Sequence, residues 1–440
     1  ALNLESDYLD TNEIYQALIE YVAQELPLYE GFEKKAIYYM LESDYISGTD
    51  ICLLLYSQHV LEEDDDYQGL LSGSLSAKNF MYNKIYNLEI TPDMLALPPC
   101  SGSFVLTDIN TGKVKALVSY PGYDANQINN VSYYASLINN SSSPLYNRAT
   151  QQTLAPGSTF KPISAIAGLE EGVIDADTYI TDYVEYTKVV PHANCWNSAG
   201  HGTINVEQAI EYSCNYFFYD VGRRVGIEKL DEYAAKFGLG QKTGVELSEA
   251  AGVVASPEFT ESLGGKWYEG NVLSVAIGQE STQVTPIQLA NYISTLANGG
   301  TRYTTHLLKT VKSGDFSQVS YAAEPEVAGT VEMKPENLAA VTRGMHSMTT
   351  GEGSLARVFQ DVPVQVAAKT GSAQVNGQSN SNAVFVCYAP YDDPQIAISI
   401  AVEKGGSGSS LASIAAEILQ YYFTAQDGQG QLPAENTLVP

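Results

Sequence analysis

Strand-like segments stand at both ends of the main part of this chain, and this placement limits the fold more than any other feature of the sequence. Residues 103–108 and 113–120 flank the turn Asn110-Thr111-Gly112, which predicts a β-hairpin. Three apolar, β-branched segments follow much later, at residues 364–369, 383–389 and 395–403. Because helical patterns fill the interval, we expect an α/β fold of the α+β kind, in which helices flank a central antiparallel sheet built from both ends of the domain.

The helices expected in that interval have ordinary start and stop signals. Thr285 before Pro286 predicts a capped start, and Asn298-Gly299-Gly300 predicts an end. Similar signals predict helices over residues 164–171, 205–222, 228–237, 286–297, 335–348 and 411–424. Residues 125–150 are rich in Asn and Ser, so we expect a loop there.

The region before the hairpin is acidic and is predicted to be mostly helical. Periodicity or capping residues predict helices at residues 32–42 and 51–61, after Ser76 and after Thr91-Pro92. The charged run at residues 62–66 is expected to be a solvated loop. No catalytic pattern lies in this region, so packing or docking is its expected role. The expected division is residues 1–97, 98–428 and 429–440, namely a helical lobe, the main domain and a tail.

The charge balance excludes some partners. The chain has 23 Lys and Arg against 51 Asp and Glu, and a net charge of −28 opposes binding to nucleic acid or to an anionic membrane face. Five scattered cysteines do not make a disulfide framework. No run approaches about 18 apolar residues, and the first residues lack the order of a signal peptide. We therefore expect a soluble piece, either complete or cut from an anchored protein.

The stretch from Pro156 to Pro162 is the strongest candidate for chemistry. Pro156 and Gly157 make a turn and Pro162 suits a first helical turn, which together place Ser158 at a helix N-terminus. Lys161 lies about one turn away on the same face. An amine desolvated there, beside a second cation, can be neutral and take the proton of the serine hydroxyl. An isolated Ser-x-x-Lys is more often only a capped helix with a surface lysine.

Two further motifs follow in order, Ser213-Cys214-Asn215 and then Lys369-Thr370-Gly371 on a predicted strand. An ordered set of this kind is typical of penicillin-binding proteins and class A β-lactamases. Residues 100–424 resemble the transpeptidase domain of class B penicillin-binding proteins, the peptidoglycan D,D-transpeptidases, with a lean toward elongation- or sporulation-type members from Gram-positive bacteria. The stretches that carry the resemblance beyond the motifs are residues 112–124, 155–162, 278–290, 297–300 and 369–374. It implies a β-lactamase/transpeptidase-like fold.

The resemblance implies a catalytic role for five residues. Ser158 would attack the carbonyl of the penultimate D-Ala of a stem peptide, and Lys161 would act as its base. Ser213 would relay the proton to the leaving amine, Asn215 would hold the substrate amide, and Lys369 would supply positive charge. These roles describe an acyl-enzyme that an amine from a second stem peptide resolves.

Substrate binding is assigned by the same resemblance. The expected residues are Thr370, Gly371 and Ser372, with Thr370 and Ser372 on the terminal carboxylate. The backbone amides of Ser158 and Ser372 would form the oxyanion hole.

The resemblance also implies ligands, a partner and a location. The ligands would be peptidoglycan stem peptides and β-lactam antibiotics, the partner a membrane glycosyltransferase, and the location the extracytoplasmic face of the cell membrane. No cofactor is required for catalysis. The N-terminal membrane anchor of such proteins is absent from the sequence and residues 1–97 are at most a remnant of their pedestal, so we expect a truncated piece.

Other functions share these motifs. A serine β-lactamase would need a base that deacylates the enzyme with water, and a D,D-carboxypeptidase would hydrolyse the same bond as the transpeptidase. A β-lactam sensor or scaffold would bind without turnover. No glycosyltransferase domain is visible, which argues against the bifunctional class A proteins.

A second cluster of residues suggests a metal. Four of the ten Cys and His residues fall within one short stretch, namely His192, Cys195, His201 and Cys214. Two thiols and two imidazoles can close a tetrahedral site, so one hypothesis is a structural zinc that braces the wall of the active site. The alternative is that Cys214 is simply a small buried side chain and that His201 precedes Gly202 for a backbone reason.

Overall fold

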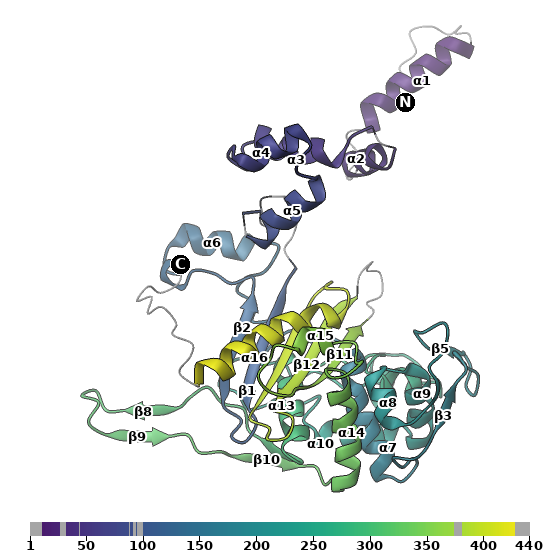
Figure 1. Ribbon diagram of the computed structural model, residues 1–440, viewed down its shortest axis with the longest axis vertical. Helices are drawn as coiled ribbons and strands as arrows, with labels where there is room; N and C mark the ends of the chain where they lie inside the picture. The colour runs from purple at the N-terminus through teal and green to yellow at the C-terminus, as the bar shows by residue number, and fades with distance from the viewer. Residues whose placement is uncertain are drawn as a thin grey trace. The chain divides into compact units, whose positions relative to one another are not determined.

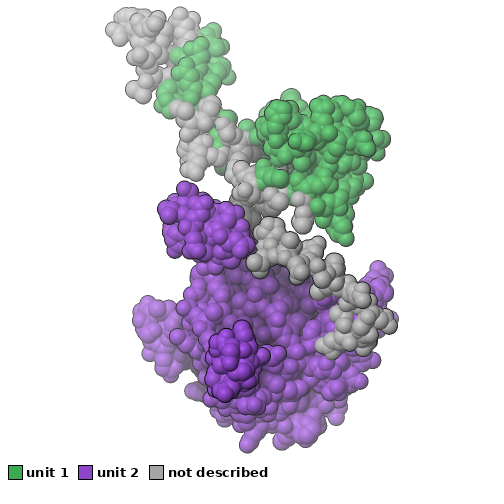
Figure 2. Space-filling model, turned by 90° about the vertical axis from the view of Figure 1, so that its left-hand side faces the viewer, with its two compact units in different colours: residues 1–99 green, residues 100–440 purple. Residues whose placement is uncertain are grey.

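The computed structural model describes residues 11–26, 32–43, 45–87, 89–90, 94, 100–373 and 381–426. The chain divides into two compact units, residues 1–99 and 100–440 (Figure 2). The expected domain limits at residues 97 and 428 stay predictions. The expected cap at Thr91-Pro92 and the tail at 429–440 lie outside the described residues.

The first unit is helical, as predicted. Its helices are α1 (Thr11–Glu25), α2 (Phe32–Glu42), α3 (Gly48–Ser57), α4 (Asp65–Ser72) and α5 (Ala77–Tyr86). Side-chain oxygens of Ser47, Asp64 and Ser76 cap the last three helices by accepting backbone N–H groups. Tyr56, Leu70 and Phe80 are buried between them in a small apolar core.

A buried lysine corrects the prediction for the charged run at residues 62–66. Lys84 is only 2% exposed, and its Nζ lies 2.6 Å from Glu89 Oε2, 3.0 Å from Asp66 Oδ2 and against Asp64. Asp64 and Asp66 therefore bind Lys84, and the expectation of a merely solvated loop is wrong for them. The cause is a counter-charge on the next helix, which a local charge count does not reveal.

The second unit is built around one antiparallel sheet, which confirms the expectation of strands from both ends of the domain (Figure 1). The strand order is β11-β12-β13-β1-β2, where the strands are β1 (Gly102–Asp108), β2 (Val114–Tyr120), β11 (Ala367–Ala373), β12 (Asn382–Ala389) and β13 (Ile396–Val402). The early hairpin is joined to the late strands by β1 and β13, with Phe104 opposite Ile400.

Helices cover both faces of this sheet because successive side chains of a strand point to opposite sides. Val105 packs in a cluster with Ile287 of α13 (Pro286–Ala297), whereas Leu106 belongs to a cluster with Leu419 of α16 (Ala412–Gln426). Thr285 caps α13 and Pro286 begins it, as predicted. β11, the strand of the third motif, is likewise held on both sides, because Ala367 and Ala368 are buried in two different apolar clusters.

The remaining helices and strands lie mostly between β2 and β11 in the sequence. The helical elements are α6 (Val131–Asn139), η3 (Ala125–Gln127), η4 (Gly157–Phe160), α7 (Lys161–Glu170), α8 (Val206–Glu211), α9 (Asn215–Val225), α10 (Ile227–Lys236), α11 (Pro257–Ser262), α12 (Asn271–Ala276), α14 (Pro335–Ser347), α15 (Ala356–Phe359) and η5 (Gly408–Leu411). The short strands are β3 (Ile180–Asp182), β4 (Glu185–Tyr186), β5 (Ala193–Asn194), β6 (Gly202–Ile204), β7 (Thr301–Tyr303), β8 (Thr310–Lys312), β9 (Val319–Ala322) and β10 (Val327–Thr330). Within the described ranges, no helix combines the length and the apolar character needed to cross a bilayer.

Two further predictions of local structure, both in the second unit, are wrong. The expected loop at residues 125–150 contains α6, because the Asn130 side chain caps it by accepting N–H groups from Ser132 and Tyr133. The single helix expected over residues 205–222 is split into α8 and α9, because Ser213 adopts a left-handed conformation with φ +55°. The second break matters for function, since it falls on the second motif.

Candidate active site

Ser158 lies in a short turn that leads directly into a buried helix. It belongs to η4, and α7 begins three residues later at Lys161 with Pro162 in its first turn, as predicted. The Thr159 hydroxyl donates to Pro156 O at 2.8 Å and fixes the turn. Lys161 has no exposed surface. The sequence therefore places a partly accessible hydroxyl above a fully buried amine.

The break between α8 and α9 brings the second motif to that amine. Ser213 sits at the break, and Cys214 caps α9 by accepting the N–H of Phe217 at 3.4 Å. A left-handed serine costs roughly 1–3 kcal/mol, so the surrounding contacts must hold it. Lys161 Nζ supplies one, donating to Ser213 O at 2.6 Å.

The third motif lies on β11, against the turn of Ser158. A Cβ on Gly371 would lie 2.6 Å from Pro156 O, and one on Gly157 would lie 3.1 Å from Ser372 O. Glycine at both positions therefore lets the turn and the strand approach each other closely. Gly157 also has φ +55°, which a side chain would strain. The N–H groups of Ser158 and Ser372 belong to these two closely packed segments.

Two lysines meet at the second motif. Lys161 Nζ lies 2.7 Å from Asn215 Oδ1, and Lys369 Nζ lies 2.9 Å from Ser213 Oγ. Burial lowers the pKa of Lys161 to about 7, and burial together with the charge of Lys161 lowers the pKa of Lys369. A neutral Lys161 has two N–H donors, and Ser213 O and Asn215 Oδ1 accept both. The lone pair of the Lys161 Nζ is then free to accept a proton.

An open cleft of about 530 Å³ contains the predicted residues. Five of them line it, namely Ser158, Ser213, Asn215, Thr370 and Ser372. Lys161 and Lys369 lie beneath this lining at zero exposure. In this structure the Ser158 hydroxyl makes no hydrogen bond to either lysine among the described residues, so the predicted contact of Ser158 with Lys161 is not formed here.

Several residues of the cleft were not predicted from the sequence. They are Asn194, Trp196, Tyr219, Ile277, Gln279, Ser381, Ser407 and Ser409. Trp196 is the most informative, since its Nε1 donates to Ser213 O at 2.9 Å and helps to hold the strained residue. These residues come from separate loops with no shared spacing, so only the tertiary fold reveals them.

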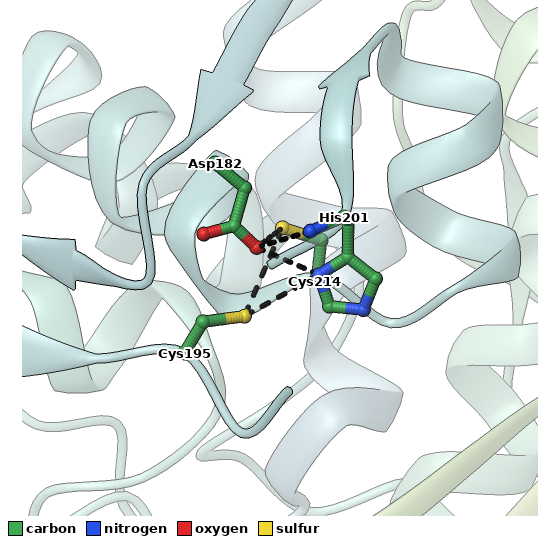
Figure 3. A group of neighbouring side chains, drawn as sticks. All are labelled: Asp182, Cys195, His201 and Cys214. Carbon is green, nitrogen blue, oxygen red and sulfur yellow. Dashed lines mark hydrogen bonds and ion pairs between the residues drawn. The ribbon is translucent and has the colours of Figure 1, made fainter. Parts of the chain in front are cut away.

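A compact group of four side chains of types that can bind a metal includes Cys214 of the second motif (Figure 3). The group consists of Asp182, Cys195, His201 and Cys214, and each offers one ligand atom within 4.8 Å of the others. Asp182, Cys195 and Cys214 are buried, and the side chain of His201 is 5% exposed. The Cys195 and Cys214 sulfurs are 4.0 Å apart, and Cys195 Sγ lies 3.5 Å from His201 Nδ1. When two sulfurs bind one tetrahedral zinc with Zn–S bonds of about 2.3 Å, the sulfurs lie about 3.8 Å apart. The two sulfurs therefore lie at about the separation that a tetrahedral zinc would hold.

The structure corrects one member of the predicted metal set. His192 points to Glu185, with Nδ1 3.0 Å from Oε1, and 42% of its side chain is exposed. Asp182 takes its place and lies 2.7 Å from His201 Nδ1. The reason is strand pairing, because β3 and β6 place Asp182 opposite Gly202, beside His201. Cysteine and histidine spacing alone does not indicate an aspartate from another strand.

Hydrogen bonds within this group shape its electrostatics. The hydrogen bond between the two thiols lowers the pKa of Cys195 and raises the pKa of Cys214. Burial would raise the pKa of Asp182, but the hydrogen bonds from His201 and the Val184 N–H outweigh burial and lower it. The group thus gathers negative charge around His201, which is what a divalent cation needs.

Comparisons with known proteins agree with this geometry. Residues 102–420 match the family model described as the penicillin binding protein transpeptidase domain. The chain is 34% identical over 359 residues to the peptidoglycan D,D-transpeptidase MrdA of Escherichia coli K12, covering 76% of this chain and 56% of that protein. It spans about half the length of the curated relatives that it matches, 52% and 56% for two of them.

Solved structures give the same result. A crystal structure of Pseudomonas aeruginosa PBP2 in complex with WCK 5153 is 34% identical with a TM-score of 0.67, and the match covers 77% of each chain. A ceftriaxone acyl-enzyme complex of penicillin-binding protein A from M. tuberculosis is 27% identical with a TM-score of 0.63, covering 73% of each chain. The expectation that the chain is most similar to members from Gram-positive bacteria stays a prediction. The chain belongs to the penicillin-binding protein transpeptidase family, and its resemblance to the class B, elongation-type members is confirmed.

Proposed function

We propose that this chain is a peptidoglycan D,D-transpeptidase that works through an acyl-enzyme on Ser158. Ser158 Oγ attacks the carbonyl carbon of the penultimate D-Ala, and its proton passes to Lys161 Nζ. The peptide C–N bond then breaks, and the terminal D-Ala leaves as an amine that takes a proton through Ser213. An amine of a second stem peptide attacks the ester carbonyl, forms the cross-link and releases Ser158.

One observation carries this proposal: the fully buried Lys161 has no carboxylate partner among its described contacts. Its N–H groups go to Ser213 O and Asn215 Oδ1, at 2.6 and 2.7 Å. A carboxylate would stabilise the ammonium, whereas these neutral acceptors are compatible with a free amine. The arrangement therefore supports Lys161 as the base for Ser158.

Lys369 and the residues after it are the proposed site for the substrate carboxylate. Two neighbouring amines repel each other when both are charged, so loss of a proton from Lys161 favours a charged Lys369. The hydroxyls of Thr370 and Ser372 line the cleft where that carboxylate would lie. The N–H groups of Ser158 and Ser372 are the proposed oxyanion hole, which the close packing at Gly371 supports.

Intact-protein mass spectrometry after incubation with a penicillin tests the proposal. A penicillin should add one whole drug mass to the wild-type chain and nothing to a Ser158→Ala variant. Consumption of the drug without a lasting adduct would instead indicate a serine β-lactamase. A stable adduct with only hydrolysis of D-Ala-D-Ala peptides would indicate a D,D-carboxypeptidase, and an adduct without any peptide turnover a β-lactam sensor. Neither adduct nor consumption would remove the support for Ser158.

We also propose that Asp182, Cys195, His201 and Cys214 hold a structural zinc. When bound, the metal ties β3, the loop of Cys195 and the N-terminus of α9 together behind Ser213. Catalysis does not require it. Because Cys214 stands between Ser213 and Asn215, fixing its sulfur restrains both catalytic neighbours.

A matched pair of histidine variants tests the zinc proposal. Protein purified without chelator should contain close to one zinc per chain, and His201→Ala should lose it while His192→Ala, at the exposed histidine, keeps it. Less than about a tenth of an equivalent of metal in the wild type would refute the proposal. Equal loss in both variants would also contradict it.

The partners and the location follow from the family. Stem peptides and β-lactams are the proposed ligands, and a membrane glycosyltransferase is the proposed partner at the extracytoplasmic face of the cell membrane. The negative net charge is consistent with a protein that does not bind nucleic acid.

A further inference from the structure

A second cavity adjoins the catalytic cleft. It measures about 560 Å³, and Gln279 lines both spaces. Its other lining residues are Gln152, Thr153, Ala155, Ser274, Glu280, Ser281, Gln283, Asn382 and Glu403, a set that we call the side pocket. Ala155 precedes Ser158 by one turn of chain. The side pocket therefore opens beside the nucleophile and not on a remote surface.

The side pocket is acidic and rich in hydrogen-bond acceptors. Glu280 and Glu403 line it, no lysine, arginine or histidine does, and neither glutamate forms an ion pair within the described part of the chain. Asn271 donates to Glu280 at 2.7 Å, while Ser101 and Gln152 donate to Glu403. Each carboxylate keeps acceptor capacity, because an ionised carboxylate accepts about four hydrogen bonds.

The two carboxylates indicate the kind of ligand. Gln152 is only 6% exposed, and its Nε2 must face Glu403 because a carboxylate only accepts. Gln152 Oε1 and Ser281 Oγ have no hydrogen-bond partner among the described residues, so the protein alone does not satisfy every polar atom of this wall. The remaining acceptor capacity of Glu280 and Glu403 favours a ligand that is positive and donates hydrogen bonds.

We propose that the side pocket binds the primary ammonium group of the acceptor stem peptide. This inference rests on the proposed function and adds the site of its second substrate. The catalytic cleft lies above Lys369, which the proposed function requires to be charged, and so it suits an anionic donor and repels an ammonium. An acceptor amine is charged in neutral water. The side pocket attracts that charged form next to Ser158. The ammonium gives one proton to solvent as it moves onto the acyl ester, and a second proton passes to Ser158 Oγ as the new C–N bond forms and the ester C–O bond breaks.

The fate of one acyl-enzyme tests this inference. A thioester analogue of the D-Ala-D-Ala donor acylates the enzyme, and mass spectrometry then measures the ratio of aminolysed to hydrolysed product. The acceptor is a lysine derivative blocked at its α-amine and carboxyl group, so that its only charge is a primary ammonium. Using a ratio from the same acyl-enzyme cancels differences in acylation between variants.

Charge removal in the side pocket should lower only the reaction with the charged acceptor. Glu280→Gln combined with Glu403→Gln should reduce the aminolysis ratio roughly three- to tenfold, and Glu280→Gln alone should reduce it in the same direction. Hydroxylamine, a nucleophile that is uncharged near neutral pH, should react equally with the wild type and the variants. Glu352→Gln, at an exposed glutamate outside the pocket, should behave as the wild type.

The outcomes separate this inference from the function on which it rests. A wild-type chain that a penicillin does not acylate overturns both. Acylation with a ratio that is the same in wild type and Glu280→Gln overturns only the side pocket, as does an equal fall with hydroxylamine. A wild-type acyl-enzyme that never reacts with the lysine derivative overturns it as well. Should the double variant not fold, the single variant decides.

Discussion

Lys84 in the helical unit and Lys161 in the other unit are both buried within a set of hydrogen bonds, and the two amines have opposite properties. Lys84 in the helical unit is 2% exposed and contacts three carboxylates, Asp64, Asp66 and Glu89. Burial alone would lower its pKa, but the hydrogen bonds to these carboxylates outweigh burial and raise it. Lys161 in the catalytic unit is equally buried and its hydrogen-bond partners are neutral, namely a carbonyl, an amide oxygen and, at 3.3 Å, the Ser213 hydroxyl, so burial lowers its pKa to about 7. Burial alone therefore does not turn a lysine into a base. The hydrogen-bond partners of the amine determine whether its pKa is raised or lowered.

On the proposed function, this difference in partners separates a structural lysine, Lys84, from a reactive one, Lys161. Lys84 stays an ammonium and joins α4, α5 and the turn after α5. Lys161 is close to losing its proton at neutral pH, which a general base must do. The same substitution at both positions should therefore have opposite consequences for activity and stability.

The largest effect is expected for Lys161→Met. Losing a positioned base typically costs about 10²–10⁴ in rate, so acylation of Ser158 by a penicillin should fall by that factor. The free energy of unfolding should stay within about 1 kcal/mol of the wild type, because relief of the desolvation cost offsets the lost hydrogen bonds. Acylation assays quenched at several times check the rate, and urea denaturation checks the free energy of unfolding. A variant that acylates at more than a third of the wild-type rate would show that Lys161 is not the base.

A change of pH should act on the two lysines in opposite senses. Lys161 must be neutral to act, so the acylation rate should fall about tenfold per pH unit below about 7. Its folded pKa lies below the unfolded value of about 10.4, so the unfolded chain binds more protons between these values and stability rises with pH in that window. Lys84 has a raised folded pKa, so its contribution is complete below about 10.4 and is lost above it.

Denaturation of wild type and Lys161→Met at several pH values between neutrality and about 10 checks this sign. The difference in unfolding free energy between the two proteins should change with pH, since only the wild type gains from loss of the lysine proton. Parallel curves would mean that Lys161 titrates normally, and the comparison with Lys84 would then break down.

Lys84→Met should reduce stability and spare catalysis. Removing one partner of a fully buried ion pair costs about 3–5 kcal/mol, but the three carboxylates here are 37–44% exposed, so a loss of about 1–2 kcal/mol is expected for the helical unit. Hydrogen exchange on α3–α5 measures the local loss, with penicillin acylation as the control. Protection equal to the wild type would indicate that the carboxylates do not stabilise the unit through Lys84.

The smallest effect is expected for Asp66→Asn. It removes one of three negative charges, and Glu89 and Asp64 remain in contact with Lys84. We expect a loss of less than about 0.5 kcal/mol, which the same exchange measurement should detect as a small fraction of the Lys84→Met effect. A loss as large as that of Lys84→Met would mean that Asp66 is the essential partner.

Much of the active site could be predicted from the sequence because its chemistry is local. Ser158 and Lys161 share one turn of chain, and the hairpin and late strands follow simple alternation. The sequence does not reveal the left-handed Ser213, since nothing in the residues nearby predicts a break inside a helical pattern. The sequence also does not reveal the position of Asp182 or the carboxylate partners of Lys84, for a related reason. They are long-range neighbours of opposite character, and only the packed fold brings them together.

The order of strands in the sheet has a consequence for how the domain is made. The middle strand, β13, consists of residues Ile396–Val402 and lies between β12 and β1. During synthesis the β1–β2 hairpin exists for almost three hundred residues with an unpaired edge, which is an aggregation hazard until β13 emerges. Pairing over such a distance in sequence is slow. The sheet is therefore complete only after β13 has been synthesised, and a chain stopped short of β13 should be handled by the cell as an unfolded protein.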